Sequence, residues 1–183
     1  MKLIGIAGFA GSGKTTMASL MMGRLHKDCL MGVFPFAQPI KQTLAGLFNE
    51  DIQLWESQKT KNNLVTGHTF TRREAMRTFG TEWGRSLEPD LWIRIHATTI
   101  SPYTSHTNFC IVVPDVRFIS EAEYILDQGG EIIEILSNDT KAGEHESEHG
   151  LPARYIKHRI FNDKNKPFDN LIKQVDDLIP LLL

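Results

Sequence analysis

Two short stretches of the sequence place reactive residue types at spacings that support a defined chemistry. GFAGSGKT, residues 8–15, fits G-x-x-x-x-G-K-[ST], a pattern whose backbone amides and lysine bind phosphate groups. HESEH, residues 145–149, fits H-E-x-x-H, in which two histidines on one helix face bind zinc beside a glutamate base. The two patterns predict different kinds of site, so the elements around each of them must decide between the two.

The phosphate-binding pattern has the surroundings that its mechanism requires. KLIGIA, residues 2–7, is a short apolar run that predicts a buried strand, and apolar residues at helical spacing predict a helix over residues 15–27. The glycines in between let backbone N–H groups converge on an anion, and the helix start adds a partial positive charge. We expect six residues to bind the phosphates of ATP: Gly11, Ser12, Gly13, Lys14, Thr15 and Thr16.

A magnesium ion is expected to accompany ATP at such a loop. Lys14 should reach the β- and γ-phosphates, and the Thr15 hydroxyl should coordinate Mg²⁺. Asp115 follows a strongly apolar run, and we expect it to hold a Mg²⁺-bound water from the end of a neighbouring strand. Asp115 can also serve as the N-cap of a helix that starts near Arg117, and the two roles are compatible.

The zinc pattern lacks comparable support. It is bracketed by Gly143 and Gly150, and it has no apolar stripe with which a helix could pack. Apart from His158, no third ligand is evident downstream. A zinc hydrolase is therefore a minor alternative to a nucleotide enzyme.

The bulk composition limits the partners. The chain has 183 residues, of which 41% are hydrophobic and 23% charged, enough for one domain with a core. A formal net charge of −2 excludes a general attraction to nucleic acid or to an acidic membrane, so we expect small-molecule nucleotides as partners. Cys29 and Cys110 indicate no disulfide framework, and the N-terminal residues make a poor signal peptide, which together favour the cytoplasm.

Strand-like and helix-like segments alternate along the chain, which predicts an α/β fold. We expect a three-layer fold of one domain, residues 1–183, with a mostly parallel five-stranded sheet and helices on both faces. The expected strands are residues 2–7, 29–36, 108–115, 131–136 and 155–161. Helices are expected over residues 15–27, 37–49, 71–80, 117–130 and 166–182, with another from about residue 89 to residue 100. Thr71 should cap the third of these and Gly80 should end it, whereas residues 50–70 carry no clear pattern.

Arginines gather in one part of the sequence. Five of the nine arginines fall within residues 72–94, and a kinase whose acceptor is itself a phosphate needs such cations to offset the repulsion between two polyanions. Arg77 and Arg85 flank FGTEWG, a predicted glycine-rich break that a ligand could approach, so we assign them to the acceptor. The other three, Arg72, Arg73 and Arg94, are expected to form a solvated helix face.

Two further cations have open assignments. Arg117 lies near the expected carboxyl edge of the sheet, where it can clamp the transferring phosphoryl group or pair with a carboxylate. Lys41, one turn into the second helix, is either an acceptor contact or a surface lysine.

Several blocks together resemble the deoxynucleoside monophosphate kinases of tailed phages. The blocks run in order through most of the chain: GFAGSGKTT, FAQPIK (36–41), RTFGTEWGR (77–85), PDLWIR (89–94), VVPDVRFISEAEYI (112–125), HESE (145–148) and IFND (160–163). The resemblance implies phosphoryl transfer from ATP to a deoxynucleoside monophosphate, for DNA replication, in the host cytoplasm if a phage encodes the protein. It also implies an acceptor-binding helical region of about residues 37–100, which holds Lys41, Arg77 and Arg85. Gln38 departs from the acidic residue expected at its position.

The same resemblance gives HESEH a different role. The resemblance implies that residues 137–154 form a lid-like segment. In this segment His145, Ser147 and Glu148 match the family's H-x-S-E and would help to fix the closed lid. Arg154 would swing toward the phosphates. Closure of such a lid excludes water and limits wasteful hydrolysis of ATP.

Base recognition is the least defined part of the prediction. Phe36 and Trp92 are assigned to the substrate site as aromatic rings that can stack on a base, although aromatics at such positions are more often core. Two other functions stay open: a P-loop kinase of another small molecule, such as a cofactor precursor, and a P-loop ATPase without an acceptor. The sequence does not reveal the accepted bases, the selectivity for deoxyribose, or whether the chain forms a homodimer.

Overall fold

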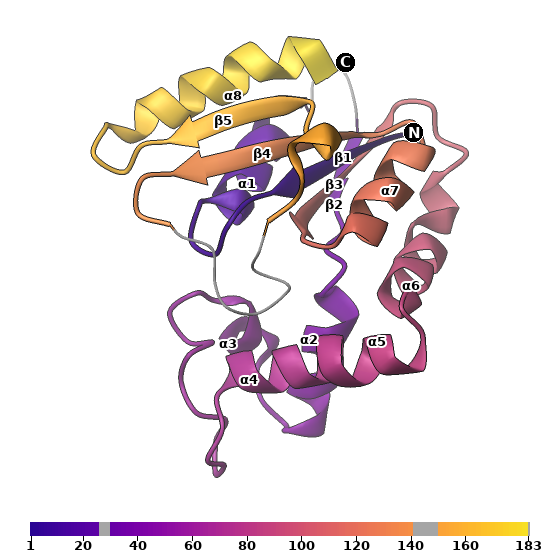
Figure 1. Cartoon of the computed structure of the whole chain (residues 1–183), viewed down its shortest axis with the longest axis vertical. Coiled ribbons are helices and arrows are strands. Elements are labelled where there is room, and N and C mark those ends of the chain that lie inside the picture. Colours follow the sequence, from indigo (N-terminus) through magenta and orange to yellow (C-terminus); the bar gives the residue numbers. More distant parts are fainter. Residues whose placement is uncertain (26–29, 141–149, 183) are drawn as a thin grey trace. The chain divides into compact units, whose positions relative to one another are not determined.

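The computed structural model describes residues 1–25, 30–140 and 150–182. Its sheet has five strands in the order β2-β3-β1-β4-β5, and each pair of neighbours is parallel (Figure 1). The strands are β1 (Lys2–Ala7), β2 (Leu30–Val33), β3 (Phe109–Val116), β4 (Glu131–Ser137) and β5 (His158–Asn162). The expected five-stranded α/β fold is therefore confirmed, and all four strand pairings of the sheet are parallel.

The chain divides into two compact units. Unit 1 comprises Met1–Pro35 and Thr99–Leu183 and contains the sheet, whereas unit 2 comprises Phe36–Thr98 and is helical. The helices of unit 1 are α1 (Lys14–Leu25), α7 (Ile119–Asp127) and α8 (Phe168–Leu182), with short 3₁₀ turns at Ser101–Tyr103 and Ala153–Tyr155. Those of unit 2 are α2 (Gln38–Leu47), α3 (Ile52–Glu56), α4 (Arg72–Arg77), a π-helical stretch (Thr78–Trp83) and α5 (Gly84–Leu87), followed by α6 (Leu91–Ile100), which runs past its boundary.

Helices cover both faces of the sheet in unit 1. Side chains of β1, such as Ile4 and Ile6, share one buried cluster with Met17 of α1 and Val175 of α8. The other face of β1 lies against α7, since a Cβ atom on Gly5 would stand 2.9 Å from Cδ1 of Ile125. Strands that are buried on both faces are typical of parallel sheets with crossover helices, which explains the continuous apolar runs in β1 and β3.

A β-bulge interrupts the pairing of β1 with β3 next to the phosphate-binding loop. Gly5 pairs with Val113 and Ala7 pairs with Val116, so two residues of β3 oppose one residue of β1. Those two residues are Pro114 and Asp115, and a bulge is one of the few places in a sheet that tolerates a proline. Because a bulge changes the direction of a side chain, the Pro-Asp pair gives Asp115 an orientation that a regular strand would not.

The predicted end of a helix at Gly80 is wrong. The chain continues from α4 through the π-helical stretch into α5, and Gly80 and Gly84 are buried within this run. A Cβ atom on Gly80 would stand 2.7 Å from Cδ1 of Ile40, and one on Gly84 would stand 2.5 Å from Cζ2 of Trp92. The two glycines therefore permit close packing, and the predicted glycine-rich break at FGTEWG does not exist.

The predicted solvent exposure of Arg72 is also wrong. Its guanidinium donates to both carboxylate oxygens of Glu50, at 2.7 and 2.5 Å, and both side chains are almost fully buried. Glu50 also accepts hydrogen bonds from the backbone N–H and the hydroxyl of Thr66. This network holds the segment after α3, and the Thr71–Glu74 capping box predicted for α4 is confirmed.

Within residues 1–25, 30–140 and 150–182, no helix is both long and apolar enough to span a bilayer.

Candidate active site

The loop between β1 and α1 has the backbone conformation that an anion-binding loop needs. Gly8, Gly11 and Gly13 have φ angles of 142°, 83° and 109°, which non-glycine residues rarely adopt. At Gly8 the space is closed as well, because an added Cβ atom would stand 2.4 Å from the carbonyl oxygen of Ile135. The loop closes on itself through a hydrogen bond from the Ser12 N–H to the Phe9 carbonyl, at 3.2 Å.

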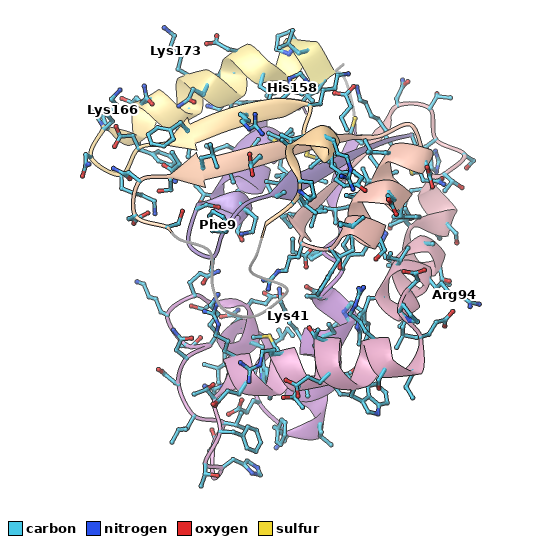
Figure 2. The ribbon with its side chains drawn as sticks, in the orientation of Figure 1. Phe9, Lys41, Arg94, His158, Lys166 and Lys173 are labelled. Atoms are coloured by element: carbon cyan, nitrogen blue, oxygen red, sulfur yellow. The ribbon has the colours of Figure 1, made fainter. Side chains whose placement is uncertain are left out.

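The ammonium group of Lys14 is hydrogen-bonded to the backbone of this loop. Its Nζ donates to the carbonyl oxygens of Gly8 and Phe9, at 2.7 and 2.8 Å. The same side chain lines a small pocket with residues from the loop, from the end of β3 and from the segment before the second 3₁₀ turn: Gly8, Phe9, Ala10, Val116, Arg117 and Gly150. Figure 2 marks Phe9, which lies on the loop between β1 and α1. Lys14 and Arg117 thus contribute two positive charges to one pocket.

The donor groups around this pocket fit a phosphate. Ser12 is fully buried, and its hydroxyl has no hydrogen-bond partner among the described residues, although a buried hydroxyl normally has one. Residues Lys14, Thr15 and Thr16 open α1, where the first turn leaves backbone N–H groups without helical partners. Cations, a helix N-terminus and a spare hydroxyl form a set of donors that suits the phosphates of a nucleotide.

The sheet register explains why Asp115 and Arg117 lie beside the loop. Val116 of β3 pairs with Ala7, the last residue of β1, so the residues on either side of Val116 lie where the loop begins. Asp115 is half-buried inside the bulge, and Arg117 is exposed just beyond the strand. Both residues stand at the carboxyl edge of a parallel sheet, where such folds place their ligands.

Glu121 of α7 holds the turn that carries Arg117. One carboxylate oxygen of this almost fully buried residue accepts the backbone N–H groups of Arg117, at 2.8 Å, and of Phe118, at 3.1 Å. Burial raises the pKa of the Glu121 carboxyl to about 7, against hydrogen bonds that lower it, and the negative charge of Asp115 raises it further. Glu121 was not predicted to have a role, although its place four residues after Arg117 was a usable signal.

The residues predicted for the acceptor lie in unit 2. Lys41 and Arg85 are half-buried, and Arg77 is exposed, with its Nε 3.5 Å from a carboxylate oxygen of Glu82. Arg94 is largely exposed and pairs with Glu88, as expected of a solvated helix face. Acceptor binding by Lys41, Arg77 and Arg85 stays a prediction.

The two aromatic residues predicted to meet a base are buried. Phe36 is 3% exposed and packs against the ring of His96, with 4.6 Å between ring centroids. Trp92 is 7% exposed, and its indole N–H donates to the carbonyl of Gly80 at 2.5 Å. Both side chains have core contacts within unit 2, so their stacking on a base stays a prediction to which the structure adds no support.

Most of the predicted lid residues cannot be described. His145, Ser147 and Glu148, and with them the whole HESEH pattern, lie outside the described residues. Arg154 is exposed and lies over the ring of Tyr155, with 4.8 Å from its Cζ to the ring centroid. The Tyr155 hydroxyl in turn donates to Glu123 of α7, at 2.8 Å. Arg154 is thus held beside α7, and its movement toward phosphates stays a prediction.

Comparison with known proteins identifies the family. The family model described as deoxynucleotide monophosphate kinase matches residues 50–175, more than half of the chain. The chain belongs to the deoxynucleotide monophosphate kinase family. The resemblance drawn from the sequence blocks is thereby confirmed.

Two relatives of this kinase family cover most of the chain. A protein of Acanthamoeba polyphaga mimivirus named putative deoxynucleotide monophosphate kinase is 31% identical, over 80% of this chain and 82% of its own length. The deoxynucleoside-5'-monophosphate kinase of Escherichia phage T5 is 23% identical, over 87% of this chain and 89% of its own. A solved APS kinase from Mycobacterium tuberculosis aligns with 98% of this chain and 96% of its own, at 14% identity and a TM-score of 0.46, a likeness that carries no functional argument.

Proposed function

We propose that this member of the deoxynucleotide monophosphate kinase family transfers the γ-phosphoryl group of ATP to the phosphate of a deoxynucleoside monophosphate. The products are ADP and the deoxynucleoside diphosphate. The observation that carries the proposal is the pocket in which Lys14 and Arg117 converge beside the glycine loop and the start of α1. Family membership supplies the class of acceptor.

The donor phosphates are assigned to the loop. We assign their binding to the amides and side chains of Gly11, Ser12, Gly13, Lys14, Thr15 and Thr16. Lys14 exchanges its hydrogen bonds with the neutral loop carbonyls for bonds to the β- and γ-phosphates, in which the donor and the acceptor both carry a charge. Thr15 would hold Mg²⁺ directly and Asp115 would hold it through water. The ion, when bound, neutralises charge on the β- and γ-phosphate oxygens.

The transfer step needs charge stabilisation more than proton transfer. The attacking oxygen belongs to the acceptor phosphate and is already ionised, so no strong general base is required. Arg117 is assigned to the transferring phosphoryl group, whose equatorial oxygens carry the charge of the transition state. Arg77 and Arg85 are assigned to the acceptor phosphate, where planar guanidinium groups suit bidentate contacts.

One assay separates this function from its alternatives. The protein is incubated with ATP and Mg²⁺, each deoxy- and ribonucleoside monophosphate is added in turn, and release of ADP is followed. Turnover that depends on a deoxynucleoside monophosphate supports the proposal. Turnover without any acceptor would instead identify an ATPase. No turnover with any nucleoside monophosphate would contradict the proposal and favour a kinase of another small molecule.

A further inference from the structure

The segment that follows β5 contacts the phosphate-binding loop from outside. The side-chain amide of Asn162 donates to the carbonyl oxygen of Ser12, at 2.8 Å. Two residues later, Nζ of Lys164 donates to the carbonyl oxygen of Gly11, at 3.2 Å. Two successive carbonyl groups of the loop thus have donors supplied by a segment that lies near the other end of the chain. No role is assigned to Asn162 or Lys164 by the phosphate-binding pattern itself.

These bonds fix the direction of loop amides. Within one planar trans peptide the C=O and the N–H point to opposite sides. The carbonyl of Ser12 shares its peptide with the N–H of Gly13, so a donor that holds the carbonyl outward turns this N–H toward the inner side of the loop. An anion-binding loop depends on amides that converge on the anion, and an outward carbonyl in a partly buried position needs a partner.

Asn162 is itself held in place by contacts with the sheet and, through its neighbour, with α8. Its backbone pairs with Ser137 of β4 in the sheet register. On the outer side of β5, the side chain of Gln174 from α8 accepts from the N–H of Phe161, at 3.0 Å, and donates to the Phe161 carbonyl, at 2.9 Å. The residue immediately before Asn162 is therefore held by a helix, while the sheet holds Asn162 on its other side.

Close packing ties Asn162 to a glycine of the loop. A Cβ atom on Gly13 would stand 2.7 Å from Nδ2 of Asn162, a distance that real contacts of this kind do not show. Lys164 is attached more loosely, because its ammonium is partly exposed and is also 3.7 Å from a carboxylate oxygen of Asp139. Asn162 should thus contribute more than Lys164, whose contact is weakened by solvent.

We infer that Asn162, assisted by Lys164, is a positioning residue that holds the phosphate-binding loop in its anion-binding conformation. The inference rests on the proposed use of ATP. Neither side chain is required to touch the nucleotide, since both act through the carbonyl groups of Gly11 and Ser12. Loss of the Asn162 contact should weaken the binding of ATP and leave the binding of the acceptor nearly unchanged.

The test compares Asn162→Ala and Asn162→Asp with Asn165→Asp, a matched control for the charge in the same loop. Asn165 is exposed, so its variant adds a carboxylate without removing the bond to Ser12. Calorimetry with ATP and Mg²⁺ gives Kd, and steady-state kinetics give KM for ATP and for the acceptor. We expect both Asn162 variants to raise Kd and KM for ATP about tenfold. A change of this size corresponds to the loss of one hydrogen bond whose free-energy contribution lies in the upper part of the usual range. The acceptor KM should stay unchanged, and Asn165→Asp should have a much smaller effect.

A second pair of variants, at two lysines of the same loop, keeps the inference testable if the Asn162 variants fail to fold. Lys164→Met should raise the Kd for ATP about twofold to threefold, whereas Lys166→Met, which removes the same charge from the same loop, should raise it less. Figure 2 labels Lys166, which lies between β5 and α8. ATP affinity that is unchanged in the Asn162 variants, or lowered equally by Asn165→Asp, would overturn the inference. A wild-type chain that binds ATP without phosphorylating any deoxynucleoside monophosphate would refute the proposed function and leave this inference standing.

Discussion

Lys14 and Arg117 line one pocket because Ala7 of β1 pairs with Val116 of β3. The pairing places the end of β3 beside the start of the phosphate-binding loop, and the bulge at Pro114 and Asp115 sets the direction in which the chain leaves the strand. A local motif and a distant arginine are thus combined by the register of two parallel strands.

The first prediction concerns Arg117. Arg117→Met should lower kcat about 100-fold or more, because a cation aimed at the transferring phosphoryl group acts mainly in the transition state. KM for ATP should change much less. Steady-state kinetics at saturating Mg²⁺ provide the measurement. Arg94→Met is the control, since Arg94 is largely exposed and pairs with Glu88. Equal losses of activity in the two variants would remove Arg117 from the reaction.

The second prediction concerns the pH dependence of stability through Glu121. Its pKa is about 7 in the folded chain, against an ordinary value of 4.5. The folded state therefore binds more protons than the unfolded state between these values, and the free energy of unfolding falls as the pH rises through this window. In Glu121→Gln this loss, on the order of 3 kcal/mol, should disappear.

Urea unfolding followed by circular dichroism at pH 5 and pH 8 measures this effect. The free energy of unfolding of Glu121→Gln, relative to that of the wild type, should be higher at pH 8 than at pH 5. Because the amide oxygen of glutamine can still accept the N–H groups of Arg117 and Phe118, the turn should persist. A stability difference that does not change with pH would show that Glu121 does not titrate in this range.

The third prediction concerns the buried pair in unit 2. Arg72→Met leaves the Glu50 carboxylate buried without its main partner and should lower the free energy of unfolding by about 3 kcal/mol. All three tryptophans, Trp55, Trp83 and Trp92, lie in unit 2, so fluorescence during urea unfolding reports on this unit. Arg94→Met is again the control and should change little. Similar stability of the two variants would contradict the assignment.

The same pair has a signature at low pH. The hydrogen bond from Arg72 lowers the pKa of Glu50 to about 2, from an ordinary value of 4.5. The stabilisation by Glu50 should be present above pH 4.5 and should be lost as the pH falls toward 2. In Arg72→Met the fluorescence-detected stability of unit 2 should depend less on pH in this window.

The fourth prediction separates the acceptor from the donor. Arg77→Ala and Arg85→Ala should raise KM for the deoxynucleoside monophosphate more than KM for ATP, since we assign both guanidinium groups to the acceptor phosphate. The two Michaelis constants, measured with the other substrate saturating, give the comparison. An equal rise in both constants would place these arginines outside the acceptor site.

The parts of the fold that were predicted from sequence depend on local patterns. The strand of residues 2–7, the glycine loop and the helix after it are all specified within one short segment, and the Thr71–Glu74 cap spans one helical turn. The apolar runs that form β3 and β4 were equally clear, because strands buried on both faces leave no alternation to misjudge.

The features that were missed depend on partners far away in the sequence. Gly80 has the properties of a helix terminator, but tight packing on Ile40 makes it part of a continuous helical run. Arg72 has the properties of a surface arginine until Glu50 is placed beside it. The contact of Asn162 with Ser12 joins β5 to the first loop, and no local pattern indicates it.

The central claim is tested most directly by acceptor-dependent release of ADP in the wild type and in Lys14→Met. With ATP, Mg²⁺ and a deoxynucleoside monophosphate, the wild type should form ADP and the deoxynucleoside diphosphate in equal amounts. Lys14→Met should lose this activity, because the pocket then lacks the cation assigned to the β- and γ-phosphates. ADP release whose rate does not depend on the acceptor, or that persists in Lys14→Met, would contradict the account.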